Sequence, residues 1–129
     1  HVGTVCDASM PTYMLTHWTR DRKRGRKLDL PRVVRMLTGA QADYMGMTDR
    51  GYLRAGLKAD INIIDLDRLQ MEPPHMERDL PAGGQRLLQG ATGYVATIVA
   101  GEVVMEEGTL TGAMPGTVYR AGRQAMAAE

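Results

Sequence analysis

The stretch LTGAQADYMGMTDRGYLRAGLKADINIID, residues 37–65, predicts a short helix, two tight turns and a strand in succession. Gly46 suits the end of the helix because glycine accepts the left-handed conformation that follows a helix C-terminus. Two further glycines mark the turns, and residues 61–64 have the β-branched composition of a strand. Asp60 stands at the strand entry, where its carboxylate can accept backbone N–H bonds from the preceding turn. A generic helix–turn–strand connection also explains this pattern.

Three helices are expected in the first part of the chain. The first covers residues 10–22, begins after Ser9 and ends in a cationic run that favours the negative end of the helix dipole. The second begins near Pro31, and the third, which Thr38 can cap, is short. Helical spacing places these side chains on the buried faces of the second and third helices: Val33, Val34, Leu37, Tyr44 and Met45.

Short β-rich runs separated by glycines make up the second part of the chain. Residues 94–99 and 103–105 flank a tight turn and should form a hairpin. Residues 117–119 are expected to add a last short strand, and the proline- and glycine-rich residues 66–93 to form a long irregular loop. The fold class is therefore α+β, with a helical unit over residues 1–48 and a β unit over residues 49–129.

The composition fits one ordinary globular domain and excludes several classes of protein. The chain has 129 residues, 43% of them hydrophobic, and a net charge of +1. This charge gives no global attraction to nucleic acid or to an anionic membrane, and no apolar run is long enough to span one. The single cysteine, Cys6, excludes an internal disulfide and suits a cytoplasmic location.

The stretch at residues 37–65 resembles the end of the barrel in the amidohydrolase superfamily. There the last helix enters a small β-domain through L-T-x-x-P-A-x-x-x-G, followed by D-R-G-x-L-x-x-G-x-x-A-D and an apolar strand. Gln41 departs from this pattern, where the family often has proline. The hairpin at residues 95–104 is similar to a late strand pair of the same β-domain. The matching residues of the first pattern are Leu37, Thr38, Ala42, Gly46, Asp49, Arg50, Gly51, Leu53, Gly56, Ala59, Asp60, Ile61, Ile63, Ile64 and Asp65.

Four further segments narrow the resemblance to the N-acyl-D-amino-acid deacylase (D-aminoacylase) group: residues 1–12, 15–18, 81–89 and 93–94. The resemblance implies the terminal helices of a (β/α)8 metal-dependent hydrolase barrel followed by part of a composite β-sandwich. It implies zinc in the intact enzyme, with a catalytic aspartate just before His1 and metal ligands on earlier strands. The chain alone is then expected to bind no zinc and to be inactive.

No catalytic or metal-ligating residue is therefore expected within the chain itself. His1, Asp7 and Ser9 are the substrate-lining candidates, because in the resembling enzymes this segment lies at the face of the barrel where active sites gather. His17 and His75 show no metal-binding spacing, and we interpret them as a packing residue and an exposed loop residue.

The expected partners are the missing N-terminal barrel of the same protein, a small N-acyl amino acid in the intact enzyme and a second copy of the chain. No nucleic acid is expected, because the six cations at residues 20–27 have no aromatic residues interleaved among them. No membrane is expected, because the net charge is small and no apolar run is long enough. A dihydroorotase-like cyclic-amide hydrolase and a non-catalytic β-rich oligomerisation module remain alternatives.

Overall fold

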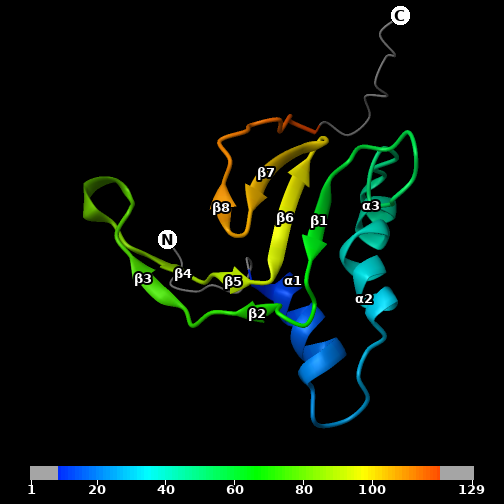
Figure 1. Ribbon diagram of the computed structural model, residues 1–129, viewed down its shortest axis with the longest axis horizontal. Helices are drawn as coiled ribbons and strands as arrows, with labels where there is room; N and C mark the ends of the chain where they lie inside the picture. Colours follow the sequence, from blue (N-terminus) through cyan, green and yellow to red (C-terminus); the bar gives the residue numbers. More distant parts are fainter. Residues whose placement is uncertain (1–8, 120–129) are drawn as a thin grey trace, which may run out of the picture.

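The computed structural model describes residues 9–119, which form helices first and antiparallel strands second (Figure 1). The helical elements are α1 (Met10–Tyr13), η1 (Met14–Asp21), α2 (Leu30–Leu37), α3 (Gly39–Met45) and η2 (Pro81–Gly83). The strands are β1 (Ile61–Ile64), β2 (Gln70–Met71), β3 (His75–Glu77), β4 (Arg86–Leu88), β5 (Ala91–Thr92), β6 (Tyr94–Val99), β7 (Glu102–Glu106) and β8 (Thr109–Leu110).

The first helix runs from α1 directly into η1, which confirms the helix predicted over residues 10–22. Its second part is wound as a π-helix, which the sequence did not predict. The wider winding is visible at its end, where the N–H of Arg22 donates to the carbonyl of His17, five residues back, at 2.8 Å. The Thr16 hydroxyl also donates to the carbonyl of Thr12 at 2.9 Å. π-helical turns of this kind are rare and concentrate at functional sites.

The buried face of α3 is not the predicted one. Tyr44 is 86% exposed and Met45 57%, while the small residues Gly39 and Ala42 are buried. A Cβ atom on Gly39 would lie 2.7 Å from the Tyr52 ring, so the helix presents its small residues to the turn that follows it. The helix therefore packs through the close approach of Gly39 to Tyr52, and not through the large apolar side chains that helical spacing predicted.

The second helix, α2, matches its prediction in part. Val33 is fully buried, whereas Val34 is 44% exposed. Thr38 stands between α2 and α3 and does not cap α3 with its side chain: its hydroxyl donates back to the carbonyl of Val34 at 2.7 Å. At the other end, Gly46 has φ +67, the left-handed conformation predicted for the helix end.

The main sheet has four strands in the order β1-β6-β7-β8, all antiparallel. The strand at Ile61–Ile64 and the β6–β7 hairpin confirm their predictions. The two turn residues, Ala100 and Gly101, have φ +52 and +87, as the tight turn between twisted strands requires. The last strand, in contrast, is at Thr109–Leu110, and residues 117–119 form none.

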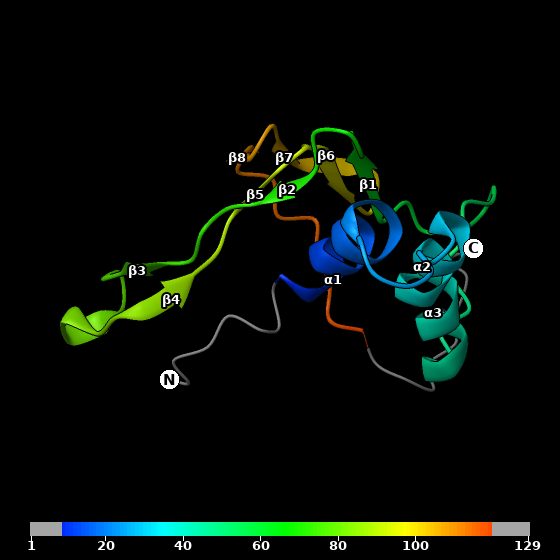
Figure 2. The ribbon, with the colours of Figure 1, turned by 90° about the horizontal axis from the view of Figure 1, so that it is seen from below.

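Residues 66–93 are more regular than expected. β2 pairs with β5, and β3 pairs with β4, so the segment is a two-stranded ribbon with η2 at its tip. Figure 2 shows this ribbon extending away from the rest of the molecule. The prediction of an irregular loop was wrong because the two halves of the ribbon pair across the tip at Pro81–Gly83, a contact that local composition does not reveal.

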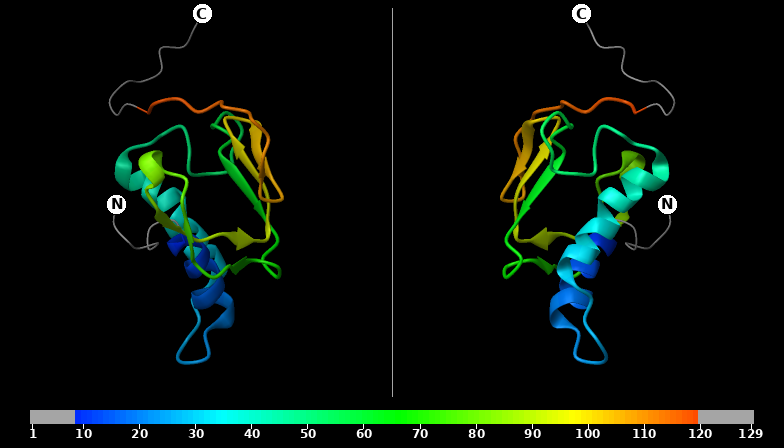
Figure 3. Two further views of the ribbon diagram at one scale, coloured as in Figure 1. Left: turned by 90° about the vertical axis from the view of Figure 1, so that its left-hand side faces the viewer. Right: turned by 90° about the vertical axis from the view of Figure 1, so that its right-hand side faces the viewer.

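The core lies where the helices approach the lower end of the sheet, and the two form separate layers (Figure 3). It is small, with Leu15, Val33 and Leu69 at its centre. Partly buried apolar residues surround these three: Met14, Leu28, Leu30, Leu37, Ile64, Leu66 and Tyr94. The α+β class is thus confirmed. The barrel origin of the helices and the division at residues 48 and 49 stay predictions.

Candidate functional site

Of the three substrate-lining candidates, only Ser9 lies within the described residues; His1 and Asp7, like Cys6, lie outside them. Ser9 occupies the position before α1, and its carbonyl accepts the N–H of Tyr13 at 3.0 Å. Its side chain does not make the capping hydrogen bond that we expected. The substrate-lining role of all three residues stays a prediction.

The helix that follows Ser9 is fixed to the sheet by a pair of hydroxyl groups. The hydroxyls of Thr12 and Tyr94 lie 2.7 Å apart, and Thr12 is only 4% exposed. Tyr94 begins β6, next to Gly93, which is buried against the backbone of Leu69. The orientation of the segment that carries Ser9 is therefore determined by a contact 82 residues away.

Two of the three histidines can be placed. His17 lies on η1, where its ring stacks on Tyr13 with centroids 4.7 Å apart and meets Trp18 edge-on at 5.4 Å. The predicted packing role of His17 is consistent with these contacts. His75 is exposed as predicted, but it lies on the strand β3 and not in a loop, with its Nε2 4.0 Å from a carboxylate oxygen of Glu77. The two imidazoles belong to different elements, the first helix and the ribbon.

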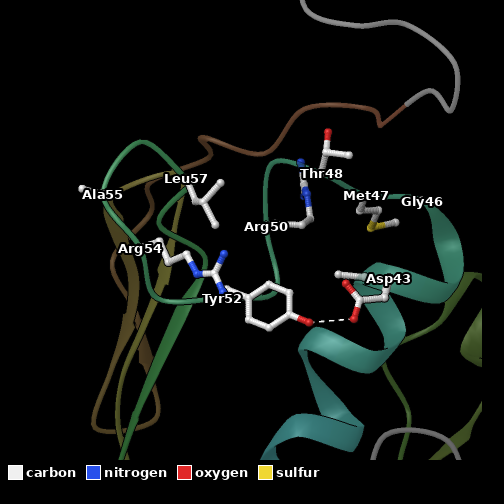
Figure 4. A pocket seen from close by; sticks show the side chains of 10 residues that line it. Asp43, Gly46, Met47, Thr48, Arg50, Tyr52, Arg54, Ala55 and Leu57 are labelled. Atoms are coloured by element: carbon white, nitrogen blue, oxygen red, sulfur yellow. Dashed lines mark hydrogen bonds between the residues drawn. The ribbon is translucent and has the colours of Figure 1, made fainter.

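A cavity of about 420 Å³ lies between α3 and the turns that connect it to β1 (Figure 4). It coincides with the stretch that carries the resemblance described above. Its lining mixes charged, polar and apolar side chains: Ala42, Asp43, Gly46, Met47, Thr48, Arg50, Tyr52, Arg54, Ala55 and Leu57.

Arg50 organises one wall of this cavity. Its guanidinium donates to Asp49 at 2.9 and 3.0 Å and to Asp60 at 3.1 Å. The hydrogen bonds from Arg50 hold the pKa of the Asp49 carboxyl below its ordinary value. The other oxygen of Asp60 accepts the N–H of Ala100 at 2.9 Å, so the N–H that it binds comes from the β6–β7 turn, not from the preceding turn as predicted. Arg50 and Asp60 thus join the helical connection to the sheet.

Tyr52 also lines the cavity, and its phenol donates to the Asp43 carboxylate at 2.6 Å (Figure 4). This hydrogen bond raises the pKa of Tyr52, because it stabilises the protonated phenol. Arg54 lies over the ring at 5.1 Å from its centroid. A phenol kept protonated in this way is a hydrogen-bond donor and not a base. No local pattern in the sequence predicts this contact between residues nine positions apart.

The described residues do not fit a catalytic metal centre. Within residues 9–119, no group of three or more His, Cys, Asp or Glu side chains is close enough together to hold a metal ion. Asp43, which lines the cavity, is instead bound by Tyr52, and Asp49 and Asp60 are bound by Arg50. The arrangement can bind and orient polar groups, and it connects two parts of the fold.

In the part of the chain that the structure describes, no helix is long and apolar enough to cross a membrane. Comparison with curated proteins and comparison with solved structures each found no match. Comparison with family models matches residues 1–105 to the amidohydrolase family. This match includes the first helix, the connection around Arg50 and the β6–β7 hairpin. Because the matched residues make up more than half of the chain, the chain belongs to the amidohydrolase family, whose members are generally metal-dependent hydrolases.

Proposed function

We propose that this chain is the C-terminal part of an enzyme that hydrolyses the amide bond of N-acyl-D-amino acids. The supporting observation is that two segments similar to the D-aminoacylase group meet in the fold. Thr12, from the first segment, contacts Tyr94, from the last, through the 2.7 Å hydroxyl pair. The adjacent Gly93 permits the approach of Leu69, since a Cβ there would lie 2.5 Å from its Cα. The contact between the first helix and the sheet is therefore made by residues from two of the segments that resemble the D-aminoacylase group.

In this proposal the metal ligands and the catalytic aspartate belong to segments of the enzyme that precede His1. The described side chains do not fit a metal centre, so no step of hydrolysis is assigned to them. Zinc is the metal that we propose for the intact enzyme. The contribution of this chain is to orient the segment that contains His1, Asp7 and Ser9, and to join the helices to the β-sheet through Arg50.

Exposed apolar side chains support the proposal that another part of the enzyme covers this chain. On the sheet, Ile63 is 48% exposed and Val103 41%. On the helices, Tyr44 and Met45 point away from the described core. Large apolar patches of this kind usually mark an interface. The proposed cover is the N-terminal barrel of the same protein.

Two alternatives compete with this proposal. A cyclic-amide hydrolase of the same family would share the connection around Arg50, but it would not need the segments similar to the deacylase group. A non-catalytic oligomerisation module would explain the exposed apolar side chains equally well. The family match over residues 1–105 favours an enzyme over the second alternative.

The test compares the chain with a longer product of the same reading frame, extended upstream of His1 and supplied with zinc. The substrates are N-acetyl-D-amino acids, their L-enantiomers and dihydroorotate. The free amino acid is quantified for the N-acetyl substrates, and the ring-opened product, N-carbamoyl aspartate, is quantified for dihydroorotate. We expect the longer product to cleave the D-substrates and chain 1–129 to cleave none. Cleavage of dihydroorotate alone would establish the cyclic-amide alternative. Turnover by chain 1–129 would refute the proposal that the catalytic residues precede His1.

A further inference from the structure

Positive charge is concentrated in one loop of this molecule. Residues 20–27, here called the cationic loop, contain six cations and one carboxylate, a local net charge of +5 in a chain of net charge +1. The loop connects η1 to α2 and lies at the opposite end of the first helix from Ser9 (Figure 1). The remainder of the chain is therefore acidic overall, and the charge of the loop is a local feature.

Part of this charge has a structural role. Arg20 pairs with Asp21 through two hydrogen bonds of 2.7 and 2.9 Å, and these lower the pKa of the Asp21 carboxyl. Arg20 also donates to the carbonyl of Leu69 at 2.9 Å and to that of Leu66. Arg20 thus attaches the start of the loop to the connection between β1 and β2, and it neutralises the one carboxylate of the loop.

Two more cations shape the loop through its own backbone. Arg22 donates to the carbonyl of Arg24, and Lys27 donates to the carbonyl of Arg20. Gly25 has φ +71, and a Cβ atom there would lie 2.8 Å from the Arg22 guanidinium, so the loop closes tightly around this side chain. The N–H of Leu28 completes the closure by donating to the carbonyl of Trp18 at 2.8 Å. The loop has a defined shape.

The remaining cations, Lys23, Arg24 and Arg26, are exposed. No carboxylate within residues 9–119 forms an ion pair with any of them. Like charges held this close repel one another, and an anion bound among them would relieve the repulsion.

Aromatic side chains that the sequence places outside the loop lie beside it in the fold. The Arg22 guanidinium lies 4.5 Å from the centroid of the Trp18 ring, and His17 contacts the edge of that ring. Together with Asp21, Lys23 and Arg24, these side chains line an open cavity of about 490 Å³. The cavity therefore combines a guanidinium held in place by an indole with two further cations at its rim.

We propose that this cavity binds a compact polyphosphate group, as in a diphosphate-bearing small molecule. Guanidinium and ammonium groups are the usual partners of phosphate oxygens, and Arg22 is already oriented by Trp18. Base stacking is disfavoured because Arg22 covers the Trp18 ring and Tyr13 covers His17. Membrane insertion is disfavoured because residues 22–27 contain no apolar side chain.

Trp18 is the only tryptophan of the chain, so its fluorescence reports on this cavity. Chain 1–129 is titrated with pyrophosphate at fixed ionic strength, and calorimetry gives the same dissociation constant independently of any optical change. The test variant carries Lys23→Ala, Arg24→Ala and Arg26→Ala. The matched control carries Arg32→Ala, Arg35→Ala and Arg78→Ala, which remove the same charge from exposed positions elsewhere. Circular dichroism verifies that both variants fold.

We expect saturable binding of pyrophosphate that weakens at least tenfold in the test variant and less than twofold in the control. Equal weakening in both variants would show a response to net charge alone and would overturn the proposal. If neither calorimetry nor fluorescence shows saturable binding of pyrophosphate up to about 10 mM, the upper limit of the assay, the proposal would also be overturned. Tighter binding of a decaglutamate peptide or of a single-stranded oligonucleotide would replace it with a macromolecular partner.

Discussion

The hydroxyl of Thr12, near the start of the first helix, lies 2.7 Å from the hydroxyl of Tyr94, the first residue of β6. Thr12 is 4% exposed, and its carbonyl also accepts the Thr16 hydroxyl. A polar pair at this position gives the two layers one orientation, since a buried hydroxyl without a partner is costly. Apolar contacts alone would tolerate several orientations.

Tyr94→Phe should therefore destabilise the chain by about 1–3 kcal/mol, because it removes the partner of the Thr12 hydroxyl that lies at the helix–sheet junction. Urea denaturation followed by circular dichroism measures the free energy of unfolding. Tyr44→Phe is the matched control, since Tyr44 is 86% exposed, and it should change that free energy by less than about 0.5 kcal/mol. Equal effects of the two substitutions would show that the Thr12 pair contributes nothing.

Gly93→Ala should destabilise the chain more than an alanine at another glycine with positive φ. At Gly93, with φ +91, a Cβ would lie 2.5 Å from the Cα and 2.6 Å from the nitrogen of Leu69, and both are backbone atoms. Gly108 has φ +80 and nothing within 4 Å of such an atom, so Gly108→Ala isolates the conformational cost of a side chain in the left-handed region, about 1–2 kcal/mol. Gly93→Ala should exceed it by roughly 1–3 kcal/mol. The comparison uses thermal and urea denaturation, and equal costs would contradict the close approach.

Local sequence signals predicted those elements that local geometry determines. The β6–β7 hairpin follows from the β-branched residues of its strands and from Gly101 in its turn, and Gly46 ends α3 in the left-handed conformation. The strand Ile61–Ile64 likewise follows from its β-branched residues. In these cases the residues that carry the signal are neighbours in sequence.

The failures depend on contacts between distant residues. Helical spacing predicted that α3 buries its large apolar side chains. The approach of Tyr52 to Gly39 shows instead that the face with the small residues is buried. The pairing of β3 with β4 joins residues about ten positions apart across the tip at Pro81–Gly83. At the candidate sites, the sequence predicted the connection around Arg50 but not the contact of Arg22 with Trp18, which depends on the closure of the cationic loop.

Arg50→Gln should flatten the dependence of stability on pH in acid. Because Arg50 lowers the pKa of Asp49 in the folded chain, the unfolded chain binds the proton first as pH falls. The stabilisation is therefore complete above the unfolded pKa, near 4, and is lost as pH falls through the lower folded pKa. Since Asp49 is half exposed, this contribution to the difference between wild type and variant should be at most about 1 kcal/mol at pH 6 and should shrink as pH falls through the folded pKa.

Urea denaturation between pH 2 and pH 7 measures this difference. Arg32→Gln, which removes an exposed charge from α2, is the control and should leave the slope unchanged. A difference that grows as pH falls would have the wrong sign for a carboxylate stabilised by Arg50, and would assign the acid sensitivity to another group.

Chain 1–129 should self-associate through one face of its main sheet. Ile61, Ile98 and Val103 are directly opposite one another on three adjacent strands, and Ile63 lies opposite Ala96 on the same face. Two of these side chains are more than 40% exposed, so a second copy can bury a continuous apolar surface. Ile63→Lys should convert the associated species to monomer in sedimentation velocity, because a buried unpaired ammonium is strongly disfavoured.

The control for this association is the neighbouring position on the opposite face. Asn62 precedes Ile63 on β1 and hydrogen-bonds to Thr97 at 2.9 Å, so its side chain points away from the apolar row. Asn62→Lys adds the same charge to the same strand and should leave the sedimentation coefficient of the associated species unchanged. If chain 1–129 sediments as a monomer at all concentrations, the apolar row on this face requires no partner in solution. If both lysine variants dissociate equally, charge or strand stability governs the association in place of the apolar face.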